Sequence, residues 1–136
     1  MESTDHAVKY LDSVGVPKNK MVIGAAFYAR IFNADTSLNN SLYQSGKFYK
    51  SVSYKQFNRK SLEEEGYTYY WDDTAKAPYM YNPATKQIYT FDDERSIRLK
   101  TKYAIDQHLN GIMFWELTND NATHDLLNEI DKAAHE

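Results

Sequence analysis

The sequence contains no cysteine, and this absence removes several kinds of chemistry at once. Without a thiol, the 136-residue chain can form no disulfide, use no thiolate nucleophile and bind no metal through sulfur. Its 16 lysines and arginines do not cluster and its formal net charge is -3, which argues against a nucleic acid or an anionic membrane as a partner. Stability must therefore come from packing, and the chain is expected to fold or to be part of something that folds.

Long apolar runs and metal-binding patterns are also missing. No run approaches the length of a membrane span, and residues 1–6 carry no basic region followed by an apolar core. Either the protein is cytoplasmic or a signal lies upstream of residue 1. The four histidines, at 6, 108, 124 and 135, show no ligand spacing, so we predict neither a metal site nor a cofactor.

Aromatic residues, in contrast, are abundant. They make up 15% of the chain, with 12 Tyr, 6 Phe and 2 Trp. Tyrosine has an apolar face and a polar tip, and both suit carbohydrate. Because tyrosine also fills half-wet cores, composition alone does not separate a sugar-binding surface from ordinary packing.

The order of predicted elements is helix, strand, mixed segment, helix, strand, helix. The expected helices cover residues 3–15, 92–107 and 123–134, and the expected apolar strands cover 21–28 and 111–116. Residues 31–91 are tyrosine-rich and interrupted by turns, with a short helix expected at 54–62 and antiparallel strands at 67–71, 77–81 and 87–91. This order is typical of an α/β barrel in which one strand-to-helix loop is enlarged into a small α+β domain.

The strand at 111–116 carries the most informative residue. Three apolar residues in succession lead to Trp115, and the polar stretch 118–121 then ends the strand. In barrels of alternating strands and helices the carboxyl ends of the strands hold the ligand, and an indole there suits the C–H face of a sugar ring. Two parallel strands cannot close a barrel and would leave open edges. We therefore expect the carboxyl-terminal portion of a larger enzyme, and self-association through the open strands.

Four stretches, in this order, resemble the end of a family 18 glycoside hydrolase, the chitinase family. They are residues 17–30, 67–81 (YTYYWDDTAKAPYMY), 90–103 (TFDDERSIRLKTKY) and 111–120 (GIMFWELTND). The resemblance implies a TIM (β/α)8 barrel, with residues 1–30 as the end of helix six and strand seven. Residues 31–91 would be the chitinase insertion domain, and residues 92–136 would be helix seven, strand eight and helix eight.

The resemblance also implies a substrate-binding set of Trp115, Tyr28, Arg30 and Glu116. Trp115 would floor the subsite of the sugar being cleaved, Tyr28 and Arg30 would line the cleft beside it, and Glu116 would reach the sugar from the rim or form an outward structural pair. The family usually has glycine between the tyrosine and the arginine, and this chain has Ala29.

The family's catalytic signature, Asp-x-x-Asp-x-Asp-x-Glu, has no counterpart in this sequence. Its final Glu protonates the glycosidic oxygen while the acetamido group of the substrate acts as nucleophile. The adjacent acids at 72–73 would point to opposite faces of a strand, and those at 92–93 are expected to cap a helix. No catalytic residue is therefore assigned, and the chain alone is expected to be inactive.

Several functions stay open at this point. The leading hypothesis is part of a chitinase acting on β-1,4-linked N-acetylglucosamine polymers, with secretion or a periplasmic location implied by the family. The alternatives are a chitinase-like lectin without the catalytic Glu, a relative that cleaves the chitobiose core of N-glycans or peptidoglycan-related chains, and a structural module that pairs with another copy.

Overall fold

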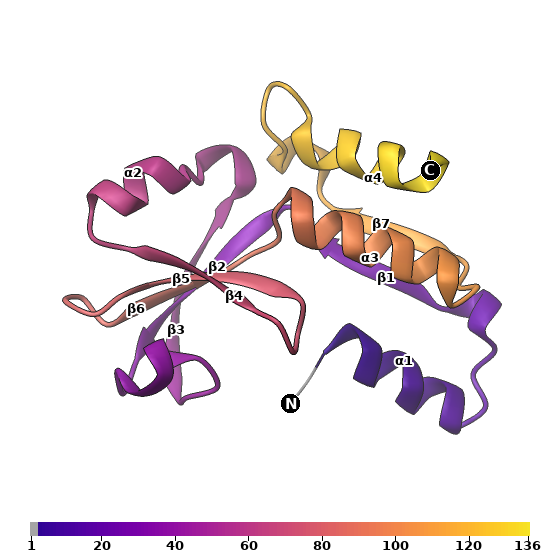
Figure 1. The fold of residues 1–136 in the computed structure, drawn as a ribbon, viewed down its shortest axis with the longest axis horizontal. Coiled ribbons are helices and arrows are strands. Elements are labelled where there is room, and N and C mark those ends of the chain that lie inside the picture. Colours follow the sequence, from indigo (N-terminus) through magenta and orange to yellow (C-terminus); the bar gives the residue numbers. More distant parts are fainter. Residues whose placement is uncertain (1–2) are drawn as a thin grey trace.

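A computed structural model describes residues 3–136 and places them around two sheets (Figure 1). The first residues of the expected segment 1–30, at positions 1 and 2, lie outside the described part. In the smaller sheet, β1 (Val22–Ala26) pairs in parallel with β7 (Gly111–Trp115). The larger sheet is antiparallel, in the order β3-β2-β6-β5-β4. Its strands are β2 (Tyr28–Ala34), β3 (Gly46–Ser53), β4 (Thr68–Asp72), β5 (Ala77–Asn82) and β6 (Gln87–Thr90).

Four α-helices accompany the sheets within the described residues. They are α1 (Thr4–Ser13), α2 (Arg59–Glu64), α3 (Glu94–Asp106) and α4 (Asp125–His135). The helix α2 lies with the larger sheet, and together they form what we call the lobe, residues 28–90 (Figure 1). The other three helices lie beside the parallel pair, so the fold is α/β with an inserted α+β lobe. Within residues 3–136, none of the helices combines the length and the hydropathy that a membrane-spanning helix needs.

The parallel pair has one covered face and one open face. The helices α3 and α4 cover the side on which Ala25 and Phe27 pack with Ile97 and Leu126. Strand residues alternate between faces, so Val22, Met113 and Trp115 project on the other side, where their exposed fractions are 47%, 49% and 62%. The open strand surface expected from the sequence is therefore present.

Helix boundaries follow from capping groups. The Ser3 hydroxyl accepts the His6 backbone N–H, and Asp93, not Asp92, forms a capping box with Ser96 at the start of α3. The helix expected at 123–134 begins two residues later, at Asp125. The helix expected at 54–62 is divided, with a 3-10 turn at Tyr54–Gln56 and α2 starting after its cap at Asn58.

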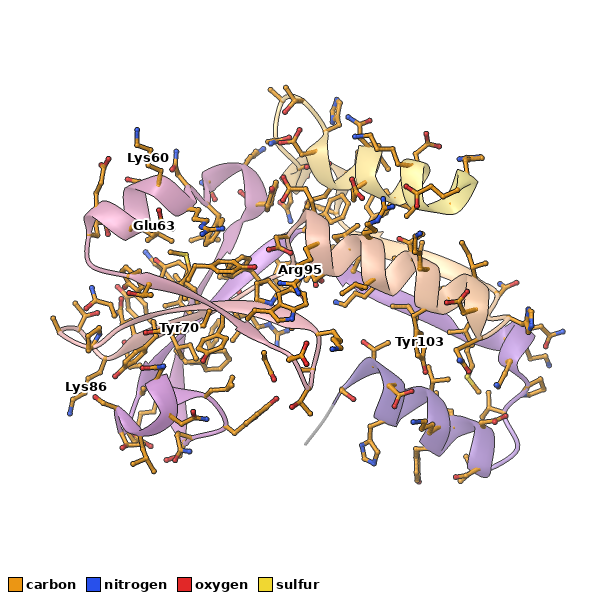
Figure 2. All side chains as sticks on the ribbon, in the orientation of Figure 1. Lys60, Glu63, Tyr70, Lys86, Arg95 and Tyr103 are labelled. Atoms are coloured by element: carbon orange, nitrogen blue, oxygen red, sulfur yellow. The ribbon has the colours of Figure 1, made fainter. Side chains whose placement is uncertain are left out.

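The apolar residues of two helices are only partly buried. In α1, Val8 is buried, whereas Leu11 and Val14 are exposed. In α3, Ile97, Thr101 and Ala104 are buried, whereas Ile105 is 50% exposed. A hydrogen bond joins the two helices: the Tyr103 side chain points from α3 toward α1, and its hydroxyl donates to Asp5 Oδ1 at 2.9 Å (Figure 2).

The first parallel strand ends earlier than the sequence predicts. That strand was predicted to run to Tyr28, but β1 ends at Ala26 and Tyr28 is already the first residue of β2. Phe27 is the one residue between β1 and β2, and its N–H donates to Trp115 O at 3.0 Å while its carbonyl accepts the Tyr54 N–H at 2.9 Å. The antiparallel strands β4, β5 and β6 lie where the sequence predicts them, whereas β3 and most of β2 were not predicted.

Candidate functional site

Trp115 lies at the carboxyl end of β7, where its backbone is hydrogen-bonded and its indole ring is exposed. Its register partner across the parallel pair is Ala26, and its carbonyl accepts the Phe27 N–H at 3.0 Å. The indole is nevertheless 62% exposed. The position predicted from the sequence, at a strand end and outside the core, is therefore the observed one, and water covers most of a large apolar surface there.

Tyr28 and Arg30 lie near this ring, at the start of β2 in the lobe sheet. They alternate along β2, so both project from the same face, and they pair with Ser53 and Ser51 of β3. The Arg30 guanidinium carbon lies 5.8 Å from the centroid of the Tyr28 ring. Arginine in this position presents a planar set of donors next to an aromatic face.

Trp115, Tyr28 and Arg30 line one open cleft of about 620 Å³ between the parallel pair and the lobe. The remaining lining residues are Ser51, Val52, Ser53, Lys55, Gln56 and Asn119. The structure thus brings together three of the four residues predicted from the sequence. Hydroxyl and amide groups that the sequence analysis did not single out complete the wall.

Ala29 does not disturb this arrangement. Its methyl group projects from the opposite face of β2 and is 1% exposed in a core with Leu62, Met80 and Phe91. An alanine in place of the glycine that the resemblance implies therefore fills the lobe core and leaves the cleft side of the strand, where Arg30 lies, untouched.

The charge of the cleft is positive. Arg30 and Lys55 are its ionisable cations, and none of the lining residues is an aspartate or a glutamate. Glu116, the fourth predicted residue, is not in the lining, and its carboxylate accepts the Thr118 hydroxyl at 2.8 Å. The cleft can therefore donate hydrogen bonds and stack on a ring, but it holds no carboxyl group that could protonate a leaving oxygen.

Trp71, the second tryptophan, has a different environment. It is half-buried in β4, and the Arg95 guanidinium carbon lies 3.6 Å from its ring centroid (Figure 2). One face of this indole is thus covered by a side chain from α3.

Two adjacent carboxylates just before α3 accept hydrogen bonds from the end of β1 and from the lobe. Asp92 is 3% exposed and accepts the backbone N–H of Ala26 at 2.8 Å, at the end of β1. Asp93 accepts the Tyr69 hydroxyl at 2.9 Å, which links the cap of α3 to the lobe. Burial and this bond to Asp93 raise the pKa of Tyr69 from 10.0 to about 12, so the hydroxyl stays protonated and donating into the alkaline range.

Comparison with known proteins points in one direction. The profile of Glycosyl hydrolases family 18 matches residues 2–120. Chitinase A1 from Niallia circulans is 37% identical over 119 residues, which cover 82% of this chain and 17% of the relative. Chitinase B from Serratia marcescens is 32% identical over an aligned length of 155, and the alignment covers 96% of this chain and 31% of the relative.

A solved structure gives the same result in three dimensions. A glycoside hydrolase family 18 N-acetylglucosaminidase from Paenibacillus barengoltzii superposes with a TM-score of 0.80 at 37% identity, covering 97% of this chain and 39% of that one. The chain therefore spans less than two fifths of the length of each of these relatives.

Proposed function

The chain belongs to glycosyl hydrolases family 18, and we propose that it supplies one part of the sugar-binding cleft of a chitinase-like glycosidase. The proposed substrates are polymers of β-1,4-linked N-acetylglucosamine, because the relatives are named as chitinases and an N-acetylglucosaminidase. The proposed reaction is substrate-assisted retaining hydrolysis, in which the acetamido group of the sugar acts as nucleophile. The glutamic acid that protonates the leaving oxygen would come from outside this chain.

The exposed indole of Trp115 is the observation that carries this proposal. The ring is 62% exposed although the backbone carbonyl of the same residue accepts the Phe27 N–H, and an exposed apolar ring that lines a cleft is a surface that a ligand can cover. The C–H face of a pyranose ring is flat and apolar, and it stacks on an indole without needing a charge. We therefore assign Trp115 to the floor under the sugar that reacts.

The lobe side of the cleft would bind the polar edge of the sugar. Arg30 offers guanidinium donors, and Tyr28 offers a ring and a hydroxyl. Ser51 and Ser53, their register partners, add hydroxyls that can donate to or accept from sugar oxygens. Glu116 faces its own loop through Thr118 and is not given a contact with the sugar.

The rest of the active barrel would cover the open face of the parallel pair. Val22 and Met113 are about half exposed on that face, and strands buried on both sides are the rule in parallel sheets. The family's substrate is found outside cells, and we accordingly propose a secreted or periplasmic location for the intact protein.

Calorimetric titration of the chain with a tetramer of N-acetylglucosamine tests the assignment. Trp115→Ala should lower the affinity by roughly 1 to 3 kcal/mol, the range of stacking on an aromatic side chain. Trp71→Phe is the matched control, because that indole is covered by Arg95 and is not in the cleft lining. Unchanged affinity in Trp115→Ala would remove the basis of the proposal.

A hydrolysis assay tests the missing acid separately. The purified chain should release no fluorophore from a chitobioside, because positioning groups alone cannot protonate the leaving oxygen. Turnover that disappears in Trp115→Ala would contradict the claim that the acid lies elsewhere. Turnover that is indifferent to this change would indicate a contaminating enzyme.

A further inference from the structure

Two backbone crossings connect the lobe to the rest of the chain, and they lie side by side. The chain enters the lobe through Phe27, before β2, and leaves it just after β6, before α3. These two strands are neighbours in the sheet, with Arg30 and Thr90 in register. The Asp92 carboxylate also accepts the Ala26 N–H at 2.8 Å, which joins the two crossings. Crossings this close together define an axis, and they do not by themselves stop the lobe from rotating about it.

The edge strand β4 makes a second connection, away from these crossings. In the order β6-β5-β4 it lies two strands from the nearer crossing, a separation of about 10 Å. Tyr69 and Trp71 alternate along β4 and project from the same face. The Tyr69 hydroxyl donates to Asp93 Oδ2 at 2.9 Å. The Arg95 guanidinium carbon lies 3.6 Å from the Trp71 ring centroid (Figure 2). These two contacts, which we call the latch, tie the edge of the lobe to the start of α3.

The junction beside the latch is not filled. A pocket of about 310 Å³ lies between the lobe and the start of α3, with Tyr54 and Phe57 on the lobe side and Glu94 on the other. Tyr69 and Asp93, which form one contact of the latch, line it too. A close-packed interface resists movement, whereas open space leaves the side chains room to shift. The angle of the lobe therefore depends on the latch rather than on close packing at this junction.

We propose that Tyr69 and Arg95 are positioning residues for the cleft, and this rests on the function proposed above. The latch sets the angle between the lobe and the parallel pair, and so fixes how far Arg30 lies from the indole of Trp115. A sugar that stacks on the indole and bonds to the lobe needs both at once, so a lobe free to rotate would hold it less tightly. Neither Tyr69 nor Arg95 lines the cleft, and each acts only through the angle of the lobe.

Double electron–electron resonance between two spin labels tests the latch. The sequence has no cysteine, so Lys60→Cys on α2 and Lys132→Cys on α4 create two unique labelling sites, one in each part, and both lysines are exposed. The labelled chain should give one narrow distance distribution. Tyr69→Phe combined with Arg95→Gln should broaden it. Tyr69→Phe combined with Arg95→Lys, which keeps a cation at the Trp71 ring, should broaden it less.

Arg59→Gln is the matched control. The Arg59 guanidinium carbon lies 4.0 Å from the centroid of the Tyr69 ring, but Arg59 belongs to α2, so this cation–π pair lies wholly within the lobe. Its loss should change neither the distance distribution nor the affinity for the N-acetylglucosamine tetramer. Tyr69→Phe combined with Arg95→Gln should lower this affinity about three- to tenfold, the cost of ordering the loosened wall on binding. Far-UV circular dichroism shows that each variant is folded.

The outcomes separate this proposal from the one on which it rests. A distance distribution that stays narrow in the double variant refutes the latch. A broadened distribution with unchanged tetramer affinity also refutes the proposal, because the angle of the lobe would then not matter to the cleft. Equal broadening in Arg59→Gln would show that the effect is not specific to the contacts with α3. If Trp115→Ala binds the tetramer normally, the cleft assignment falls, and with it the positioning role, whereas the distance measurement, which needs no sugar, still reports the angle of the lobe.

Discussion

Replacing Asp92 with alanine should destabilise the chain and loosen the cleft together. This carboxylate is 3% exposed and accepts three hydrogen bonds, from the Ala26 N–H at 2.8 Å, the Ser96 hydroxyl at 2.8 Å and the Lys100 ammonium at 2.6 Å. It thus joins the end of β1 to α3 at the point where the chain leaves the parallel pair. Asp92→Ala removes all three acceptors at once.

The three lost bonds do not cost the same. The Ala26 N–H keeps no acceptor, which costs roughly 1 to 3 kcal/mol for a buried donor. The Ser96 hydroxyl can still donate to Asp93 O, 3.2 Å away, and the Lys100 side chain is 23% exposed and can turn toward water. The loss therefore falls below the roughly 3 to 5 kcal/mol typical of a fully buried pair with one partner removed. We expect a decrease of about 3 kcal/mol in the free energy of unfolding, and a smaller one for Asp92→Asn, whose amide oxygen still accepts the Ala26 N–H.

Urea unfolding followed by circular dichroism measures this loss, and amide hydrogen exchange at Ala26 reports the local opening. Because Ala26 pairs with Trp115 and lies two residues before Tyr28, Asp92→Ala should also weaken oligosaccharide binding at a temperature where the variant is folded. Asp73→Ala is the control: its carboxylate pairs with Lys76 at the surface and should have no measurable effect. Equal stability of the two variants would refute the reasoning.

Three further predictions concern the cleft, alkaline pH and the open strand face. Tyr28→Phe should lower oligosaccharide affinity less than Trp115→Ala in calorimetry, because it removes a hydroxyl and keeps the ring. Burial and Asp93 raise the pKa of Tyr69 from 10.0 to about 12, so stability should be retained below pH 10 and fall as the pH rises to 12; a Tyr69→Phe variant with the same pH profile would contradict this. Sedimentation should show concentration-dependent association that Val22→Lys with Met113→Lys abolishes, whereas a strict monomer at every concentration would show that the open face needs no partner.

The sequence predicts best the strands whose ends are marked by a change of residue type. The strand ending at Trp115 has an apolar run and a polar stop, and β4 to β6 are bounded by turn residues. The boundary between β1 and β2 has no such signal. One alternating series of buried residues runs through both strands, at positions 21, 23, 25, 27, 29 and 31. A pattern of period two cannot tell which sheet a residue joins, so Tyr28 was placed at the end of one strand when it begins the next.

The sequence also predicts only some of the residues that line the cleft. Trp115, Tyr28 and Arg30 could be found because each follows an apolar run in the sequence and matches a family motif. Ser51 and Ser53 could not, since β3 is exposed along most of its length and its sequence shows no alternation of apolar and polar residues. Their position in the cleft comes from pairing with β2, which is a long-range contact that local sequence does not encode.

Phe27 lies between the two walls of the cleft and holds them at a set separation. Phe27 donates its N–H to the Trp115 carbonyl, accepts the Tyr54 N–H, and stacks its ring on Phe114 with centroids 4.6 Å apart and planes at 11°. These contacts fix the backbone immediately before Tyr28 relative to the strand that carries Trp115. Because a stacking floor and a hydrogen-bonding wall act on the same sugar only if their separation is constant, a fully buried linker is what such a site requires. In the proposed site, the aromatic floor thus belongs to the parallel pair, the polar wall belongs to the lobe, and the residue that links them is part of the core.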